Sequence, residues 1–340
     1  MLNKSVFKLF ANCLPVKGAK RSVICDLQYY TYKFIPNILF KILTEHKNLT
    51  MESIKSYYNN QYDSKIEEYF NTLIEEGLGF ECGEEEIERY PDLNLNWERP
   101  EKITNAIIDI DAQSTYDLSK FVMEIDSLRC KAVEVRLFSM VGLSRINEIL
   151  KTFDVTKIPG IEILMPFDDS ISEQALIELC ELFPRINLIT LFKSPRSYLK
   201  EINRVGVTIN FIDTNITSAA HCGIINPAYF NVNQAMYREA LKFNTCLNKK
   251  ISIDVNGYIK NCPSMDKSYG QISQTNLNEV LEILKFKEYW NINKDEINIC
   301  RDCEFRYICT DCRAYTQNLT VQYNKPLKCS YDPYLVKWGF

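Results

Sequence analysis

The stretch CRDCEFRYICTDC, residues 300–312, places four cysteines within thirteen positions. Cys300 and Cys303 form one CxxC pair, and Cys309 and Cys312 form another. In such a pair the short loop turns back on itself, so that both thiolates can reach one metal ion or one face of a cluster. One pair is a moderate signal, whereas two pairs so close together are a strong one. The segment therefore predicts a metal centre around which this part of the chain must fold.

Cysteine is unusually common in the whole chain. There are 13 cysteines among 340 residues, and seven lie in the last 95 residues, at positions 246, 262, 300, 303, 309, 312 and 329. The chain has no apolar run of membrane-spanning length and no signal peptide at its start, so we expect a soluble, cytoplasmic protein, in which stable disulfides are rare. Because His46 and His221 are the only histidines, any metal site must consist mostly of thiolates.

Other chemistry is poorly represented in the sequence. A net charge of −4 argues against a nucleic-acid partner, because phosphate binding requires a basic face. No glycine-rich phosphate loop and no Ser/His/Asp arrangement is visible, so neither ATP binding nor a histidine-dependent hydrolase is expected, and catalytic residues remain unknown. Four aspartates fall at the ends of predicted strands, and helix capping is the favoured role for them over acid–base chemistry: Asp109, Asp111, Asp168 and Asp169.

The pattern along the chain predicts an α/β protein of three domains. Residues 1–90 contain short strands, three amphipathic helices and a returning strand over Leu78–Cys82, which is the outline of a winged helix. The acidic run 82–102 is a candidate linker. In residues 100–240, apolar runs at 106–110, 132–138, 161–165, 186–192 and 207–212 alternate with helical patterns such as 119–127 and 173–182. This alternation predicts a parallel sheet in a partial (β/α) barrel.

Residues 241–340 hold the seven clustered cysteines. The segment KKISIDVNGYIKNC shows strand-like alternation on both sides of Asn256-Gly257, a dipeptide typical of a type I′ hairpin turn. The second strand of this hairpin leads to Cys262. A helix over 277–286 separates the hairpin from the CxxC pairs, and Arg301, Arg306, Arg313 and Lys328 are cations that could offset thiolate charge.

The spacing of these cysteines resembles the SPASM domain, the auxiliary-cluster region of radical-SAM peptide-modifying enzymes. The order here is Cys246-x10-Gly257-x4-Cys262, then Cys300-x2-Cys303-x5-Cys309-x2-Cys312, then Cys329. The only departure is x2 rather than x3 before Cys312. The resemblance implies one or two 4Fe–4S clusters. It assigns Cys300, Cys303, Cys309 and Cys329 to one complete site, and Cys246, Cys262 and Cys312 to a second, incomplete one.

The fourth ligand of the second site is left open by the sequence. Some relatives have a ligand where this chain has Ser252. The alternatives are an iron open to an exogenous ligand, a degenerate and empty site, or completion by Asp254, Cys222 or His221.

The rest of the chain resembles a radical-SAM scaffold without its radical chemistry. The CxxxCxxC motif is absent, ITNAIIDID runs into AQSTYD, and the second predicted strand is followed by SMVGL instead of a GGEP-like motif, so no S-adenosylmethionine is expected. Together with LFANCLPVKGAKRSVICDLQ, YKFIPNILFKIL and KCSYDPY, this combination resembles the SPASM-domain peptide maturases of grasp-with-spasm systems. The resemblance implies an accessory role beside an ATP-grasp ligase that makes graspetide-type crosslinks in a precursor peptide.

The N-terminal outline also resembles the PqqD-like module that recognises leader peptides. Such a module pairs the leader with an exposed sheet edge and places its side chains in a groove beside the third helix. The resemblance implies an edge around residues 22–27 and these peptide-binding residues: Val23, Cys25, Tyr69, Leu73 and Phe80.

Two other functions stay open on the sequence. One is an iron–sulfur redox enzyme that modifies the precursor at the second site. The other is a structural module stabilised by zinc, which also favours thiolates at these spacings.

Overall fold

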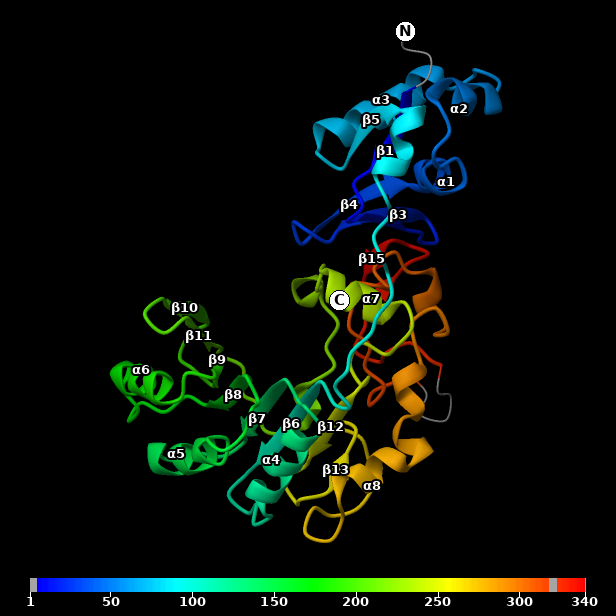
Figure 1. Cartoon of the computed structure of the whole chain (residues 1–340). Helices are drawn as coiled ribbons and strands as arrows, with labels where there is room; N and C mark the ends of the chain where they lie inside the picture. Colours follow the sequence, from blue (N-terminus) through cyan, green and yellow to red (C-terminus); the bar gives the residue numbers. More distant parts are fainter. Residues whose placement is uncertain (1–4, 318–322, 340) are drawn as a thin grey trace.

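The computed structural model describes residues 5–317 and 323–339. The molecule has three parts in a row: the N-terminal domain lies at one end, the cysteine-rich tail in the middle, and a large sheet with its helices at the other end (Figure 1). The protein is thus a mixed α/β structure with a large, mostly parallel sheet, which confirms the predicted α/β class and parallel sheet. Within the described residues, every helix is too short or too polar to span a membrane.

The N-terminal domain contains two small antiparallel sheets and three helices. Strand β1 (Ser5–Leu9) pairs with β5 (Gly79–Gly83), and β2 (Cys13–Val16), β3 (Arg21–Asp26) and β4 (Thr31–Pro36) form a second sheet. The helices are α1 (Asn37–Glu45), α2 (Met51–Tyr57) and α3 (Asp63–Glu75). A short 3₁₀ helix, η1 (Glu84–Arg89), follows β5. This is the order of elements that the sequence predicts.

Local chemistry explains where these helices begin and end. The Thr50 hydroxyl accepts a hydrogen bond from the Ser53 N–H (3.2 Å), which caps the start of α2. Helix α3 buries Ile66, Phe70 and Leu73 against the domain core. Gly77 follows it with φ of +70°, a left-handed conformation in which glycine is favoured at a helix C-terminus.

The large sheet has the strand order β10-β11-β9-β8-β7-β6-β12-β13. Its parallel strands are β6 (Asn105–Ile110), β7 (Ala132–Leu137), β8 (Gly160–Pro166), β9 (Ile186–Phe192) and β11 (Val207–Phe211). Helices α4 (Leu118–Ser127), α5 (Leu143–Lys151) and α6 (Glu173–Leu182) connect them and lie along one side of the sheet (Figure 1). The edge strand β10 (Tyr198–Ile202), antiparallel to β11, has no counterpart among the predicted strands.

The sheet continues across the predicted boundary at residue 240. Strand β12 (Lys250–Ile253) pairs in parallel with β6, and β13 (Ile259–Lys260) returns beside β12. The predicted hairpin is therefore present, but its type I′ turn is wrong. Gly257 has φ of +81°, whereas Asn256 is not among the residues with positive φ. Instead, Asp254 Oδ1 accepts hydrogen bonds from the N–H groups of Asn256 and Tyr258 and closes a longer loop.

The tail has little regular structure. Two short 3₁₀ helices, η2 (Ala219–His221) and η3 (Pro227–Tyr229), lead into α7 (Gln234–Ala240). After the hairpin come α8 (Leu277–Glu282), η4 (Leu284–Phe286), η5 (Glu288–Asn291) and η6 (Cys300–Asp302). Strands β14 (Tyr331–Asp332) and β15 (Lys337–Trp338) form a final pair. Most of the tail's backbone therefore depends on turns and on side chains for its conformation.

Candidate metal centres

Four cysteines line one pocket in the tail. They are Cys300, Cys303, Cys309 and Cys329, and the cavity has a volume of about 20 Å³. These are the four cysteines that the family resemblance assigns to one site. Within residues 5–317 and 323–339, no group of three or more His, Cys, Asp or Glu side chains could hold a single metal ion. The four thiols thus line one pocket without converging on one ion position, and four thiols are a donor set that iron–sulfur clusters and zinc both use.

A tight turn positions the first CxxC pair. Ile299 has φ of +69°, a left-handed value that is uncommon for a branched residue, and η6 starts directly after it at Cys300. The Cys303 N–H donates to the Cys300 carbonyl oxygen (3.0 Å). This turn brings Cys303 back towards Cys300, as the CxxC spacing predicts.

Burial makes these thiols weak acids. It raises the pKa of Cys300 to about 12, although the nearby ammonium of Lys294 lowers that pKa, and negative charge on Cys309 and Cys329 raises it further. Burial also raises the pKa of Cys309. Because only the thiolate binds a metal, loading this pocket must release protons, and a cation beside it favours the charged form.

Lys294 is that cation, and the sequence did not single it out. It is buried, with 5% of its surface exposed. Its Nζ lies 3.3 Å from Cys309 Sγ and donates to the Thr310 carbonyl oxygen at 2.7 Å. It lies in the polar segment NINKDEIN, so no sequence signal distinguishes it from an exposed lysine.

The four predicted cations have other contacts. Arg301 is exposed beside Asp302, Arg306 pairs with Asp295, and Arg313 donates to Asp311 Oδ1 at 2.6 Å. Lys328 donates to the backbone carbonyls of Ala220 and Cys222. Arg306 also lines the four-cysteine pocket and donates to the Cys303 carbonyl oxygen at 3.0 Å, and the expectation that these cations offset thiolate charge stays a prediction.

The second group of cysteines centres on Cys246. Burial raises the pKa of Cys262 to about 12, and negative charge on Cys246 raises it further. Burial also raises the pKa of Cys312, and Cys246 again adds to the rise. Cys262 and Cys312 therefore each lie within electrostatic range of Cys246. A cation is present here too, since Lys250 Nζ lies 3.7 Å from Cys246 Sγ.

Two candidates for the fourth ligand of this group are already used in the hairpin. The Ser252 hydroxyl is fully buried and donates to the Lys260 carbonyl oxygen at 2.9 Å. Asp254 closes the hairpin loop through one carboxylate oxygen and pairs with Lys260 Nζ at 2.9 Å through the other. Neither side chain is free to bind a metal without breaking these contacts.

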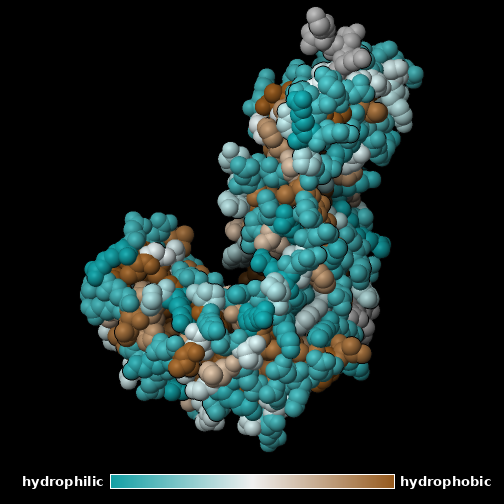
Figure 2. Space-filling view, in the orientation of Figure 1, coloured by the Kyte–Doolittle hydropathy of each residue, from teal (hydrophilic) through white to brown (hydrophobic). Residues whose placement is uncertain are grey.

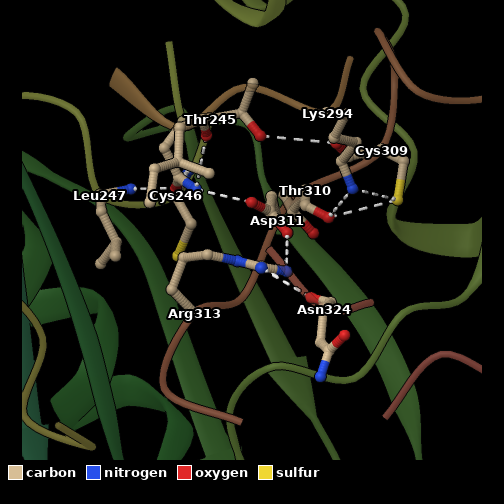
Figure 3. A network of polar contacts seen from close by, with 11 residues as sticks. Thr245, Cys246, Leu247, Lys294, Cys309, Thr310, Asp311, Arg313 and Asn324 are labelled. Carbon is tan, nitrogen blue, oxygen red and sulfur yellow. Dashed lines mark hydrogen bonds and ion pairs between the residues drawn. The ribbon is translucent and has the colours of Figure 1, made fainter. Parts of the chain in front are cut away.

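A polar network connects the two groups (Figure 3). Asn244 Oδ1 accepts hydrogen bonds from the N–H groups of Cys246 (3.0 Å) and Leu247 (2.8 Å), and Asn244 Nδ2 donates to Asp311 Oδ2 (2.6 Å). Asp311 lies between the cysteines of the second CxxC pair in sequence. Both Asn244 and Asp311 are buried. The network therefore fixes the backbone at Cys246 relative to the second CxxC pair.

The four-cysteine pocket packs against the N-terminal sheet. One apolar cluster contains Val23 and Leu27 of that domain together with Phe305, Ile308 and Cys309 of the tail. At its edge the Arg21 guanidinium pairs with the buried Glu304 carboxylate at 2.8 Å. The N-terminal domain and the tail are thus joined by a continuous core and a half-buried ion pair.

This packing corrects the predicted peptide-binding edge. Strand β3 pairs with β2 on one side and with β4 on the other, so residues 22–27 offer no free edge. Val23 and Cys25 are fully buried in the cluster with the tail, and Leu73 is buried in the core of the N-terminal domain.

Tyr69 and Phe80 lie elsewhere. Tyr69 lines a groove beside α3 of about 850 Å³, together with residues from α1 and the α2–α3 connection. The Phe80 ring instead packs between Phe10 and Tyr90, at 5.2 and 4.7 Å between centroids. Of the five predicted residues, Tyr69 alone faces this groove.

The aspartates at the strand ends do not cap helices. Asp109 on β6 forms a bidentate ion pair with Arg136 on β7, at 2.6 and 2.9 Å, and both side chains are buried. Burial opposes the charge on Arg136, but the hydrogen bonds that Arg136 donates to Asp109 hold the pKa of the guanidinium above its usual value. The caps of α4 and α6 come instead from Asp117 and Ser172.

No protein-family model matches the chain, and no curated protein matches it. Among solved structures, the chain is similar to SuiB of Streptococcus suis, with 10% identity over 96% of this chain and 98% of that one and a TM-score of 0.34. It is also similar to SuiB bound to the precursor peptide SuiA, with 11% identity over 92% and 94% and a TM-score of 0.31. Likenesses this weak carry no inference about this chain.

Proposed function

We propose that the chain is an accessory peptide-maturation protein. Its N-terminal domain binds the leader of a ribosomally made precursor, its tail carries iron–sulfur clusters, and an ATP-grasp ligase works on the core peptide held beside it. The observation that carries the proposal is the apolar cluster that joins the N-terminal sheet to the four-cysteine pocket. Because of it, a surface suited to an extended peptide and the metal-binding tail move as one body.

The leader adds as a strand to β4. Strand β4 is an outer strand of its sheet among the described residues, and Thr31, Lys33, Phe34 and Pro36 along it are exposed. Backbone groups on such an edge are free to pair with an extended peptide. The edge identified here replaces the one expected on β3.

The groove beside α3 receives apolar side chains of the leader. Helix α1 begins directly after β4, and its exposed Ile38 lies in the lining of the groove. Tyr62, Lys65 and Tyr69 line it from the region of α3. A peptide paired with β4 therefore has an apolar groove within reach, which is the arrangement that strand-addition modules use.

The tail binds one cluster at each cysteine group. Cys300, Cys303, Cys309 and Cys329 hold the first, and Lys294 offsets part of its negative charge. When bound, a cluster supplies one-electron redox capacity and a rigid crosslink between distant segments of the chain. The ATP-grasp ligase enters the proposal through the family resemblance and through the lack of a phosphate loop in this chain.

The test uses the leader of the precursor encoded beside this chain's gene, as a fluorescent synthetic peptide. Binding to the full-length protein is measured by fluorescence anisotropy. We expect saturable binding that Tyr62→Ala weakens roughly tenfold or more, because an aromatic anchor in a groove contributes about 1–3 kcal/mol. Tyr229→Ala, which removes an equally exposed tyrosine (62% against 57% exposed) from the tail, is the matched control. Equal loss in both variants, or no binding at all, would contradict the leader-binding role.

A further inference from the structure

A fourth thiol lies beside the second cysteine group. Cys222 follows η2 and belongs to the connection between the large sheet and α7, well before the first cysteine of the SPASM-like pattern. The residue is exposed as a whole, while Cys262 and Cys312 are buried, with 8% and 7% of their surface exposed. Cys222 therefore lies nearer the surface than these two cysteines.

Gly223 shows how close this connection comes to the group. A Cβ atom placed on Gly223 would lie 2.7 Å from Cys312 Sγ, and its φ is +84°. Only glycine combines that backbone conformation with that close approach. The backbone directly after Cys222 thus contacts the thiol of a predicted metal ligand.

Two cations fix the position of Cys222. Arg136 Nη1 lies 2.9 Å from Cys222 Sγ and donates to it, and the same guanidinium is held by both carboxylate oxygens of Asp109. From the other side, Lys328, the neighbour of Cys329, donates to the Cys222 carbonyl oxygen at 2.7 Å. A thiol restrained in this way is pre-positioned, as a metal ligand requires.

Electrostatics agree with this placement. Burial raises the pKa of the Cys222 thiol, the Arg136 guanidinium lowers it, and charge on Cys246 raises it again. Charge on Cys222 in turn raises the pKa of Cys262. Cys222 is therefore within electrostatic range of Cys246, which precedes the hairpin, and of Cys262, which follows it.

We propose that Cys222 is the fourth cysteine ligand of the second centre, together with Cys246, Cys262 and Cys312. The site is then a complete four-thiolate site and not one with an open iron. The inference depends on the proposed function only in requiring that the tail binds metal. It also assigns Arg136 and Asp109 as positioning residues, which aim the thiol without binding the metal.

The test compares Cys222→Ala with the wild-type protein, both reconstituted anaerobically with iron and sulfide. A 4Fe–4S cluster with three cysteine ligands has one exposed iron, which is lost after one-electron oxidation and leaves a paramagnetic 3Fe–4S cluster. We expect Cys222→Ala to lose about one iron per chain on titration with ferricyanide and to gain the corresponding electron paramagnetic resonance signal. Cys82→Ala, in the N-terminal domain, controls for removal of a cysteine as such.

The outcomes separate the ligand assignment from the proposed function. If Cys222→Ala keeps all its iron and shows no new signal while Cys262→Ala loses the second cluster, the assignment is wrong and the proposed function stands. If the wild-type protein takes up zinc and no iron, the cluster part of the proposed function fails. In that case the assignment still predicts that Cys222→Ala binds about one zinc ion fewer per chain than the wild type, and equal zinc content would overturn it.

Discussion

The large sheet and the cysteine-rich tail differ in how much regular structure and apolar core stabilise them. Strands β6 to β9 have six or seven residues each, and their side chains form one large core with α4, α5 and α6. In the tail, β13, β14 and β15 have two residues each. Figure 2 shows the N-terminal domain and the middle of the molecule as one arm that rises from the broader end, where Figure 1 places the sheet.

These differences indicate which region needs bound metal in order to fold. A segment with short elements and a small core rarely folds by apolar burial alone, and metal ligation is one of the usual substitutes. Cys300, for example, belongs to a small cluster whose other buried members are Ile292 and Ile297, and the larger cluster on the other side of the pocket is shared with the N-terminal sheet. The sheet should therefore be stable without metal, and the tail should not be.

The largest expected effect comes from Cys303→Ser. It removes one ligand from the four-cysteine pocket, and because ligation and folding are coupled, we expect loss of that metal and unfolding of the segment around it. Limited proteolysis should cut within residues 290–330 and leave the sheet intact, and a chelator should give the same pattern in the wild type. Cys180→Ala, in the core of the sheet, should keep its metal. A metal-free tail that still resists protease would show that the tail folds without metal, as the sheet does.

The next effect concerns the Asp109–Arg136 pair inside the sheet. Arg136→Met leaves the Asp109 carboxylate buried without its partner, so we expect the free energy of unfolding of the sheet to fall by about 3–5 kcal/mol. Urea denaturation followed by circular dichroism measures it. The double variant Asp109→Leu/Arg136→Met removes both charges and should regain most of the loss. A double variant no more stable than the single one would show that the charges themselves are not the cause.

Strand β12 belongs to both regions and tests how far they are independent. Ile253 is fully buried and pairs with Ile108 on one side and Ile259 on the other. Ile253→Ala should cost about 2–5 kcal/mol in unfolding free energy and should also lower metal loading, because Cys262 follows β13. Ile163→Ala, on β8 at a similar burial, should cost as much and leave metal content unchanged. Equal metal content in both variants would mean that the tail folds independently of the sheet.

Much of the sheet could be predicted from the sequence, because its strands are continuous apolar runs. The runs at 132–138 and 186–192 correspond to β7 and β9 within one residue. What could not be predicted depends on register between distant strands. Asp109 lies opposite Arg136, and a capping aspartate and an ion-paired one look alike until that register is known.

The tail shows the reverse. The family resemblance carried by the cysteine spacing indicated which four cysteines would share a pocket, although periodicity predicted almost nothing of the surrounding backbone. The sequence did not indicate Lys294, which only folding brings to the thiols, and it left Cys222 as one of three alternatives for completing the second site. The N-terminal edge was misplaced for a similar reason: short strands are visible in the sequence, but their order in the sheet is not.

The smallest expected effect concerns the cap at the start of helix α6. The Ser172 hydroxyl accepts a hydrogen bond from the Ala175 N–H at 3.2 Å and caps α6. Ser172→Ala should therefore lower the unfolding free energy of the sheet by about 1 kcal/mol and leave metal content unchanged, which thermal denaturation and metal analysis can check. Asp168→Ala removes an exposed carboxylate whose hydrogen bonds go to Ser170 alone, so its effect should be smaller. If Asp168→Ala costs more than Ser172→Ala, the helix starts under the control of the strand-end aspartate after all, and the capping expected from the sequence would hold for α6.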